Sequence, residues 1–249
     1  ALSAWLLATY TFPIGFVILF SLAAAILLVG WVFFTRIREP SLPVDGPPMG
    51  QSQFLASLPR LLKDDPPFRR FLYARLLLSL GGMGLGFVTV AAVRQWAVAD
   101  GTVGLYTGAL LLGQTVGNLV FGLLADRRGH KFALEWAALA YAAAFALAWL
   151  APGAAWYYAV FLLIGVSQGI LVVSGILVLF EFSEPKRRPT YIGLANTSLG
   201  VVNVLGPMAA AWLAGVDFGV LFAACAGISF VSWVSMRWWV EEPRRMARA

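Results

Sequence analysis

The chain turns at Gly122-Leu-Leu-Ala-Asp126-Arg127-Arg128-Gly129-His130-Lys131, the largest charge cluster between two of its apolar runs. Each flanking run is long enough to cross a bilayer, which takes about 20 residues of helix. Inside hydrocarbon an irregular backbone lacks hydrogen-bond partners, and Arg or Lys is costly. The stretch therefore predicts a turn between two membrane-spanning helices, outside the hydrocarbon region.

The composition of the 249-residue chain excludes an ordinary soluble domain. Hydrophobic residues make up 60% of it and charged residues only 12%, whereas soluble proteins carry about 25% charged residues. Apolar runs recur along the whole sequence, and the alternating segments typical of a membrane β-barrel are missing. The composition predicts an all-α protein that crosses the membrane several times.

Seven runs have the length and composition of membrane-spanning helices. Seven of the 13 prolines lie between residues 40 and 67, which indicates a linker between the first run and the other six. Apolar residues at helical spacing in this linker predict a short helix on the membrane surface: Phe54, Leu55, Leu58, Leu61 and Leu62. The predicted spans are 14–35, 71–98, 102–125, 132–150, 155–180, 191–214 and 217–238.

The positive charges are distributed unevenly along the chain. Of 18 Lys and Arg residues, 17 lie in 36–75, in 126–131, in 184–190 or from Arg237 onward. All these segments fall on one side if every apolar run crosses, and only Arg94 falls opposite. This is the positive-inside pattern, which places the segments in the cytoplasm and excludes a nucleic-acid partner as the reason for the net charge of +6.

The pattern Gly-x-Leu-Ala-Asp-Arg-x-Gly-x-Lys at 122–131 resembles the signature loop of the major facilitator superfamily (MFS) of secondary transporters. In that family the loop follows the second helix and recurs after the eighth. The present stretch resembles the second copy. The resemblance implies an MFS-like six-helix C-terminal bundle over residues 71–240, corresponding to helices 7 to 12.

A weak internal repeat extends the resemblance to the start of the chain. Trp5 and Arg38-Glu39-Pro40 are spaced much as Trp212 and Glu241-Glu242-Pro243 are, and transporters with two parallel halves carry such repeats. Helices 1 to 4 are then expected upstream of Ala1. The remaining parts are the end of the N-terminal bundle at 1–35 (the tail of helix 5, then helix 6), a cytoplasmic linker at 36–70 and a cytoplasmic tail at 241–249.

The loop offers the parts of a cytoplasmic gate. Gly122 and Gly129 allow two helices to approach across a tight turn, and Gly129 is free to take a positive φ. Asp126 is predicted to cap the helix that begins near Tyr191. The resemblance implies this contact and also a bond from a basic residue to an acid at the end of the preceding helix, here Glu181. The basic candidates are Arg127, Arg128, Lys131, Arg187 and Arg188.

His130 departs from the family pattern, which has a basic residue at this position. A histidine is largely neutral at pH 7, so the predicted gate is weaker or sensitive to pH. The alternative interpretation is that all these charges are ordinary cytoplasmic anchors.

Three amide side chains lie near the middle of predicted spans that the resemblance places around a central cavity, and two more lie on the same helix faces, Asn118 with Gln114 and Asn196 with Asn203. Amides can bind a polar solute in a water-filled cavity, and they can also bond to a neighbouring helix. We expect the set to line the cavity, and we expect Gly108, Gly113 and Gly117 to pack against a neighbouring helix. The five amides are Gln114, Asn118, Gln168, Asn196 and Asn203.

Four glycines cluster within the span 71–98, where they would make the helix easy to bend. This favours a hinge, and the alternative is tight helix packing. The glycines are Gly81, Gly82, Gly84 and Gly86.

Enzymatic functions have little support. The single histidine lies in the loop, and the common nucleotide-binding, metalloprotease and hydrolase motifs are missing, so we expect no enzyme, no cofactor and no metal site. The resemblance implies secondary active transport of a small solute by alternating access in the cell (inner) membrane. The weakly charged half-cavity favours an uncharged or lipophilic solute, such as a drug or a sugar, and both uptake by a permease and export by an efflux carrier stay open.

The expected partners are the lipid bilayer, the solute, and a coupling proton or sodium ion bound by the missing N-terminal half. Two alternatives remain open: a seven-helix receptor or sensor, and a fragment of a transporter that does not transport by itself.

Overall fold

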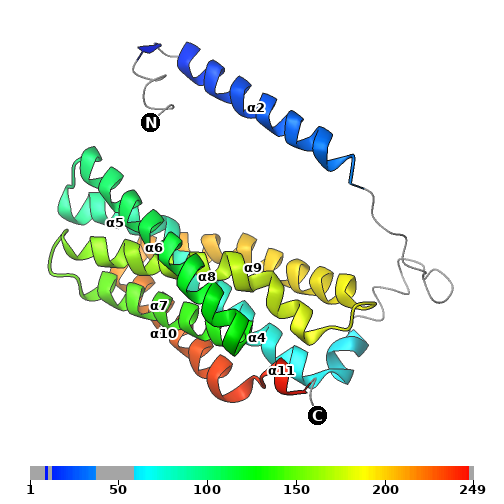
Figure 1. The fold of residues 1–249 in the computed structure, drawn as a ribbon. Coiled ribbons are helices and arrows are strands. Elements are labelled where there is room, and N and C mark those ends of the chain that lie inside the picture. The colour runs from blue at the N-terminus through cyan, green and yellow to red at the C-terminus, as the bar shows by residue number, and fades with distance from the viewer. Residues whose placement is uncertain (1–8, 11–12, 38–58, 247–249) are drawn as a thin grey trace. The chain divides into compact units, whose positions relative to one another are not determined.

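The structure, a computed structural model, describes residues 9–10, 13–37 and 59–246. Every regular element in these ranges is a helix, which confirms the all-α fold (Figure 1). The chain divides into two compact units, residues 1–49 and 50–249. Across the described residues, seven helices are long and apolar enough to cross a membrane.

The first unit contains helix α2 (Ile14–Phe34), which confirms the first predicted span. The 21 residues of α2 include no charged side chain, and nearly all of them are exposed. Such a helix suits a lipid environment. Trp5 and Arg38-Glu39-Pro40 lie outside the described residues, so the internal repeat stays a prediction.

The second unit contains the six remaining spans, and each predicted span corresponds to a helix or to a pair of joined helices. The span 71–98 begins earlier than expected, because Pro66 and Pro67 start the helix instead of ending the linker. Of the predicted surface helix, only 59–64 is described, and it is helical. The elements are α4 (Pro66–Gly81), η1 (Gly82–Gly84), α5 (Leu85–Trp96), α6 (Asp100–Arg128), α7 (His130–Leu150), α8 (Trp156–Phe182), α9 (Arg188–Val216), α10 (Phe218–Val234), η2 (Ser235–Trp239) and α11 (Pro243–Met246).

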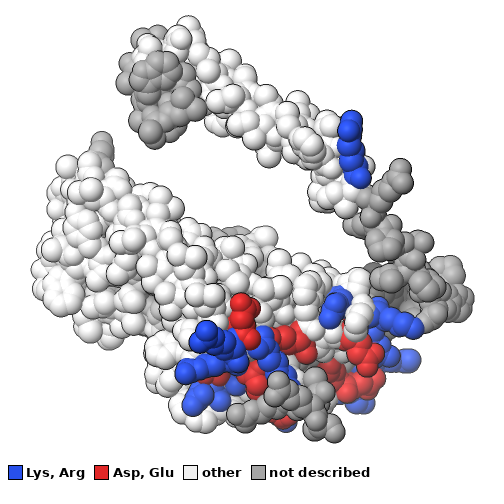
Figure 2. All heavy atoms as spheres, viewed as in Figure 1, with Lys and Arg blue, Asp and Glu red and all other residues white. Residues whose placement is uncertain are grey.

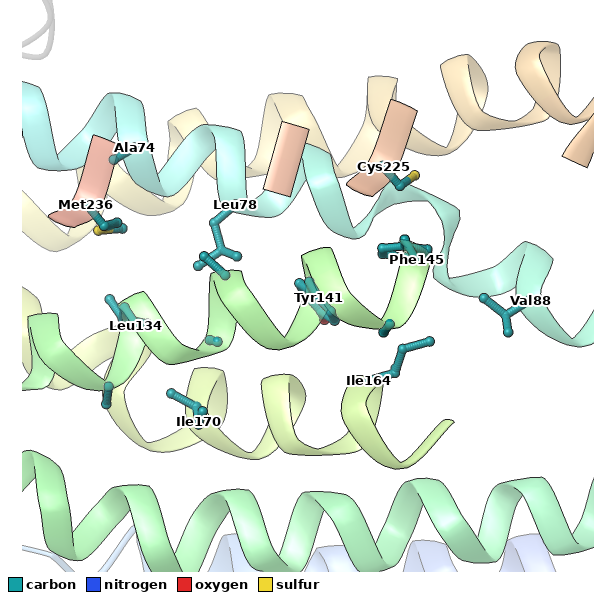
Figure 3. Packing of buried hydrophobic residues seen from close by; sticks show 14 of the residues in the cluster. Ala74, Leu78, Val88, Leu134, Tyr141, Phe145, Ile164, Ile170, Cys225 and Met236 are labelled. Atoms are coloured by element: carbon teal, nitrogen blue, oxygen red, sulfur yellow. The ribbon is translucent and has the colours of Figure 1, made fainter. Parts of the chain in front are cut away.

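The core of the bundle forms around α7, which packs against α8 and α10. Figure 3 shows Leu78 of α4, Tyr141 and Phe145 of α7 and Ile164 of α8 meeting there. The many alanines of α7 let its neighbours approach closely. By contrast, α6 and α9 are apolar but mostly exposed, so they present surfaces suited to lipid or to another apolar partner.

Helices α6 and α8 interlock through glycines from both sides. A Cβ added at Gly113, Gly117, Gly165 or Gly169 would collide with a backbone carbonyl of the facing helix. Small residues spaced four apart allow this close approach in membrane helices. The packing role predicted for Gly113 and Gly117 is confirmed. The same prediction is wrong for Gly108, which has open space beside it.

The four glycines of the predicted hinge lie where the helix changes geometry. The 3-10 turn η1 separates α4 from α5 within one membrane-spanning segment. A Cβ at Gly81 or Gly84 would collide with α10, and one at Gly82 would press against Tyr141. Gly86 has open space beside it. Tight packing therefore accounts for three of the four glycines, and the hinge stays a prediction.

Candidate functional site at the charged end of the bundle

On the face shown in Figure 2, the charged side chains of the second unit gather at one end of its helices. The turn between α6 and α7 lies there beside the end of α8, because the backbone N–H of His130 donates to Glu181 at 3.3 Å. The two basic segments 126–131 and 184–190 therefore meet at the same end, as the charge pattern predicts. The side of the membrane that this end faces stays a prediction.

Gly129 alone connects α6 to α7, with φ of 98° and ψ of 149°. The predicted positive φ is confirmed, and only glycine adopts this conformation without strain. A side chain here would also collide with the carboxylate of Glu242. The close approach predicted at Gly122 is wrong, since an added Cβ would make only an ordinary contact, 3.9 Å from Val173.

Glu181, near the end of α8, is held by a residue that the sequence did not indicate. The Nε of Arg244 donates to its Oε1 at 2.6 Å, and the Nη1 of Arg244 donates to the backbone carbonyl of Asp126 at 2.8 Å. One guanidinium therefore joins α11 to the ends of α8 and α6. A second ion pair, from Arg70 to Glu241 at 2.8 Å, attaches the same C-terminal segment to α4.

The five basic residues predicted to reach Glu181 have other environments, so that prediction is wrong. Arg128 lies over the ring of Phe132 at 5.2 Å. Arg188 lies over the ring of Phe180 at 5.1 Å. Lys131 is buried and pairs with Glu135 of its own helix, and Arg127 and Arg187 are exposed. Among these basic residues and Arg244, it is Arg244 that forms the ion pair with Glu181.

The predicted cap by Asp126 is not formed in this conformation. Its side chain is exposed, and the first turn of α9 has no side-chain cap. An acid from the start of α4 lies there instead, since the hydroxyl of Tyr191 donates to Oδ2 of Asp65 at 2.6 Å. The Oδ1 of Asp65 accepts from the backbone N–H of Phe68 at 3.0 Å and so caps α4. The order Asp-Pro-Pro before an apolar run was the available signal for this cap.

Lys131 and Glu135, one helical turn apart on α7, form a buried ion pair at 3.0 Å. Arg237 of η2 approaches the other oxygen of Glu135 at 3.6 Å. Glu135 therefore pairs with two basic side chains. The pair with Arg237 connects α7 to the end of α10 at the same charged end of the bundle.

Glu242 lies at the same charged end, and one of its carboxylate oxygens has no hydrogen-bond partner among the described residues. The side chain is partly buried, and the oxygen in question is Oε1. Burial raises the pKa of Glu242 above its ordinary value, and the carboxylates of Glu181 and Glu135 raise it further. The positive charges of Lys131 and Arg244 oppose this rise in pKa. The C-terminal segment therefore carries an acid with an increased tendency to bind a proton.

Of the five predicted cavity amides, Asn203 lies beside a described cavity. Its Oδ1 accepts from the hydroxyl of Ser79 at 2.8 Å, and both line a cavity of about 250 Å³ between α4–α5 and α9. Pro207 lies four residues later and has no N–H, so it cannot bond to the carbonyl of Asn203. This side of the cavity is therefore rich in hydrogen-bonding groups.

The other four amides are not gathered there. Gln114 and Asn118 lie where α6 packs on Gly169 of α8, and the Oδ1 of Asn118 is buried without a partner. Gln168 is partly buried, and Asn196 is exposed on α9. Their role in binding a solute stays a prediction.

Seven apolar helices in the described part of the chain, with a charged turn between α6 and α7, define a multi-pass helical membrane protein. Residues 74–249 match the family model described as Major Facilitator Superfamily. The match covers well over half of the chain, so the chain belongs to this family of membrane transporters. A search of curated proteins found no match.

Proposed function

We propose that the chain forms part of a secondary active transporter that moves a small solute across the cell membrane by alternating access. The observation that carries this proposal is the junction at Arg244, where one side chain holds the ends of α6 and α8 together. In this proposal the charged end of the bundle is the cytoplasmic gate. Residues 36–70 are the linker and 71–240 the C-terminal bundle of the transporter.

The strength of the junction suits a gate that opens and closes. Arg244 is about one-third exposed and Glu181 is mostly buried, at 34% and 12% of their side-chain surfaces. Ion pairs that water can reach contribute about 1 kcal/mol or less each. A few such contacts stabilise one conformation without preventing the other. This suits a transporter, which requires two states of similar free energy. Asp126 is free to cap α9 in the second state.

The cavity at Ser79 and Asn203 supplies a place for the solute. It lies between the segment interrupted by η1 and the helix that contains Pro207. Interrupted helices near the middle of the membrane commonly bind substrates in transporters, because they leave backbone groups free for bonding. Coupling to a proton or a sodium ion completes the proposed mechanism.

Reconstituted flux tests this proposal. The full-length protein is placed in proteoliposomes, a proton or sodium gradient is imposed, and the uptake of labelled solutes is measured for the native protein and for Asp126→Asn. We expect gradient-dependent flux that Asp126→Asn abolishes while the protein still inserts into the membrane. Unchanged flux in the variant removes the gate role of Asp126. No flux from a folded native protein favours the non-transporting alternative.

A further inference from the structure

One cation lies inside the apolar part of the bundle, although the charge pattern grouped it with the linker. Arg75 belongs to α4, and the membrane-spanning segment that α4 begins runs from Pro66 to Trp96. Arg75 is six residues from the midpoint of that segment, which corresponds to about 9 Å at 1.5 Å per residue. The hydrocarbon core extends about 15 Å to either side of its centre. Arg75 therefore lies at hydrocarbon depth.

Arg75 has no counter-ion among the residues that the structure describes. Its Nε is inaccessible to solvent and has no hydrogen-bond acceptor. The ion pairs within 59–246 do not include it, and the ionisable side chain that interacts with it is the phenol of Tyr141. Charged residues at this depth generally have a partner or serve a transported solute. The missing partner of Arg75 therefore requires a functional explanation.

The guanidinium of Arg75 reaches from α4 to α8. A Cβ added to Gly175 of α8 would lie 3.1 Å from Nη2 of Arg75, so the glycine leaves room for this group. Ser79 follows Arg75 by four residues and so lies on the same face of α4, about 5–6 Å away between Cβ atoms. Ser79 is also the residue that bonds to Asn203 at the cavity. The unpaired cation is thus one helical turn from a cavity with polar groups.

We propose that Arg75 binds the carboxylate of a small organic monoanion whose remaining part occupies the cavity at Ser79 and Asn203. This inference rests on the proposed transport function and names the class of its substrate. A planar guanidinium donates two parallel hydrogen bonds to a carboxylate, which fits it better than a single point charge does. The positive charge of Arg75 requires an anionic solute. This proposal replaces the uncharged solute expected from the sequence.

The cavity limits the size and the polarity of the part of the solute beyond its carboxylate. Beyond Ser79 and Asn203 the side chains that line it are apolar, with Met83, Leu85 and Val202 among them, and its other polar groups belong to the backbone. Its volume of about 250 Å³ lies just below the roughly 300–1,000 Å³ of pockets that hold drug-sized ligands. The anion is therefore small, with an apolar body and at most one or two hydrogen-bonding groups besides its carboxylate.

The test measures binding in the purified full-length protein in detergent. The probes are monocarboxylates from acetate to decanoate together with benzoate and 4-hydroxybenzoate, each compared with its amide. The amide preserves the shape and removes the charge. The readouts are the increase in Tm and the apparent Kd for the native protein, Arg75→Gln and Arg75→Lys. Arg94→Gln is the matched control, because Arg94 is an exposed cation near the far end of the same segment.

We expect at least one acid to raise the Tm of the native protein and of Arg94→Gln, while its amide does not. Arg75→Gln weakens that binding by about tenfold or more, which corresponds to the loss of a charge-assisted hydrogen bond. Arg75→Lys retains part of the affinity. Without solute, Arg75→Gln is as stable as the native protein or more so, because it removes a partly buried charge that has no counter-ion among the described residues.

Two results overturn the inference. In the first, no acid binds more tightly than its amide, or Arg75→Gln binds the acids as the native protein does. In the second, Arg75→Gln lowers Tm and the acids have no effect, which identifies Arg75 as half of a structural ion pair with another segment. Arg75-dependent binding without flux would contradict the transport function alone. Flux of neutral solutes that is unaffected by Arg75→Gln would contradict this inference alone.

Discussion

Arg244 donates from its Nε to Oε1 of Glu181 at 2.6 Å, across 63 positions of the sequence. The contact attaches the segment after the last membrane-spanning helix to the end of α8. The same guanidinium bonds to the backbone at Asp126, so α6 is included. The C-terminal segment is therefore part of the charged junction.

Replacing Arg244 tests this junction. We expect Arg244→Gln to lower the free energy of unfolding by about 1 kcal/mol or less, because Arg244 is partly exposed. The same change shifts the balance of conformations toward an open charged end, which spin-label distances between the α6–α7 turn and the α8–α9 turn report. Arg127→Gln is the control, since Arg127 is exposed. Equal distances in both variants would show that Arg244 does not hold the junction.

Gly129 carries a conformation that a side chain disfavours. We expect Gly129→Ala to reduce the free energy of unfolding by about 1–3 kcal/mol, because φ of 98° is strained for alanine, and the carboxylate of Glu242 also has to move aside for the Cβ. Thermal unfolding in detergent measures the effect. Gly153→Ala is the matched control, since Gly153 also lies in a turn but has open space around it. A neutral result at Gly129 would contradict the described turn.

The glycines between α6 and α8 predict a contrast along these helices. Gly165→Ala places a methyl group against a backbone carbonyl of α6, and we expect a loss of about 1–3 kcal/mol through overpacking. Gly108→Ala meets open space and is expected to be neutral or stabilising, because alanine favours a helix over glycine. Tm values of the two variants provide the comparison. Similar losses in both would rule out the close packing.

Glu242 predicts a pH dependence of stability. Its pKa is raised in the folded protein by burial, so the folded state binds a proton more readily than the unfolded state does. Stability should therefore rise as the pH falls from the raised pKa toward the ordinary value near 4.5, and fall as the pH rises through this window. We expect Glu242→Gln to remove this component in pH-dependent Tm measurements.

The control for Glu242 is its neighbour on the same segment. Glu241→Gln removes an exposed carboxylate that pairs with Arg70, and it leaves Glu242 able to titrate. The rise in stability at lower pH should persist in Glu241→Gln. If it disappears equally in both variants, the dependence belongs to the ion pair with Arg70.

The sequence predicted the helices and the turn well, because both depend on local chemistry. An apolar run of spanning length and a glycine between charges are visible without any partner. The partners of Glu181 and Asp65 were not predictable in this way, since Arg244 and Tyr191 lie 63 and 126 residues from them. Arg75 was misassigned for a related reason. The predicted span 71–98 placed Arg75 near its charged end, grouped with the basic residues of 36–75, and only the start of α4 at Pro66 places it at hydrocarbon depth.

The interlocked backbones of α6 and α8 determine which parts of the bundle are free to move. Because the glycines of each helix contact the backbone of the other, α6 and α8 cannot slide past one another without first separating. They therefore behave as one rigid unit. We expect deformation to fall instead on the two helices with a built-in irregularity, the one broken at Gly82–Gly84 and the one containing Pro207. A solute bound between these two irregular helices would be affected by each such deformation, while α6 and α8 keep their positions relative to each other.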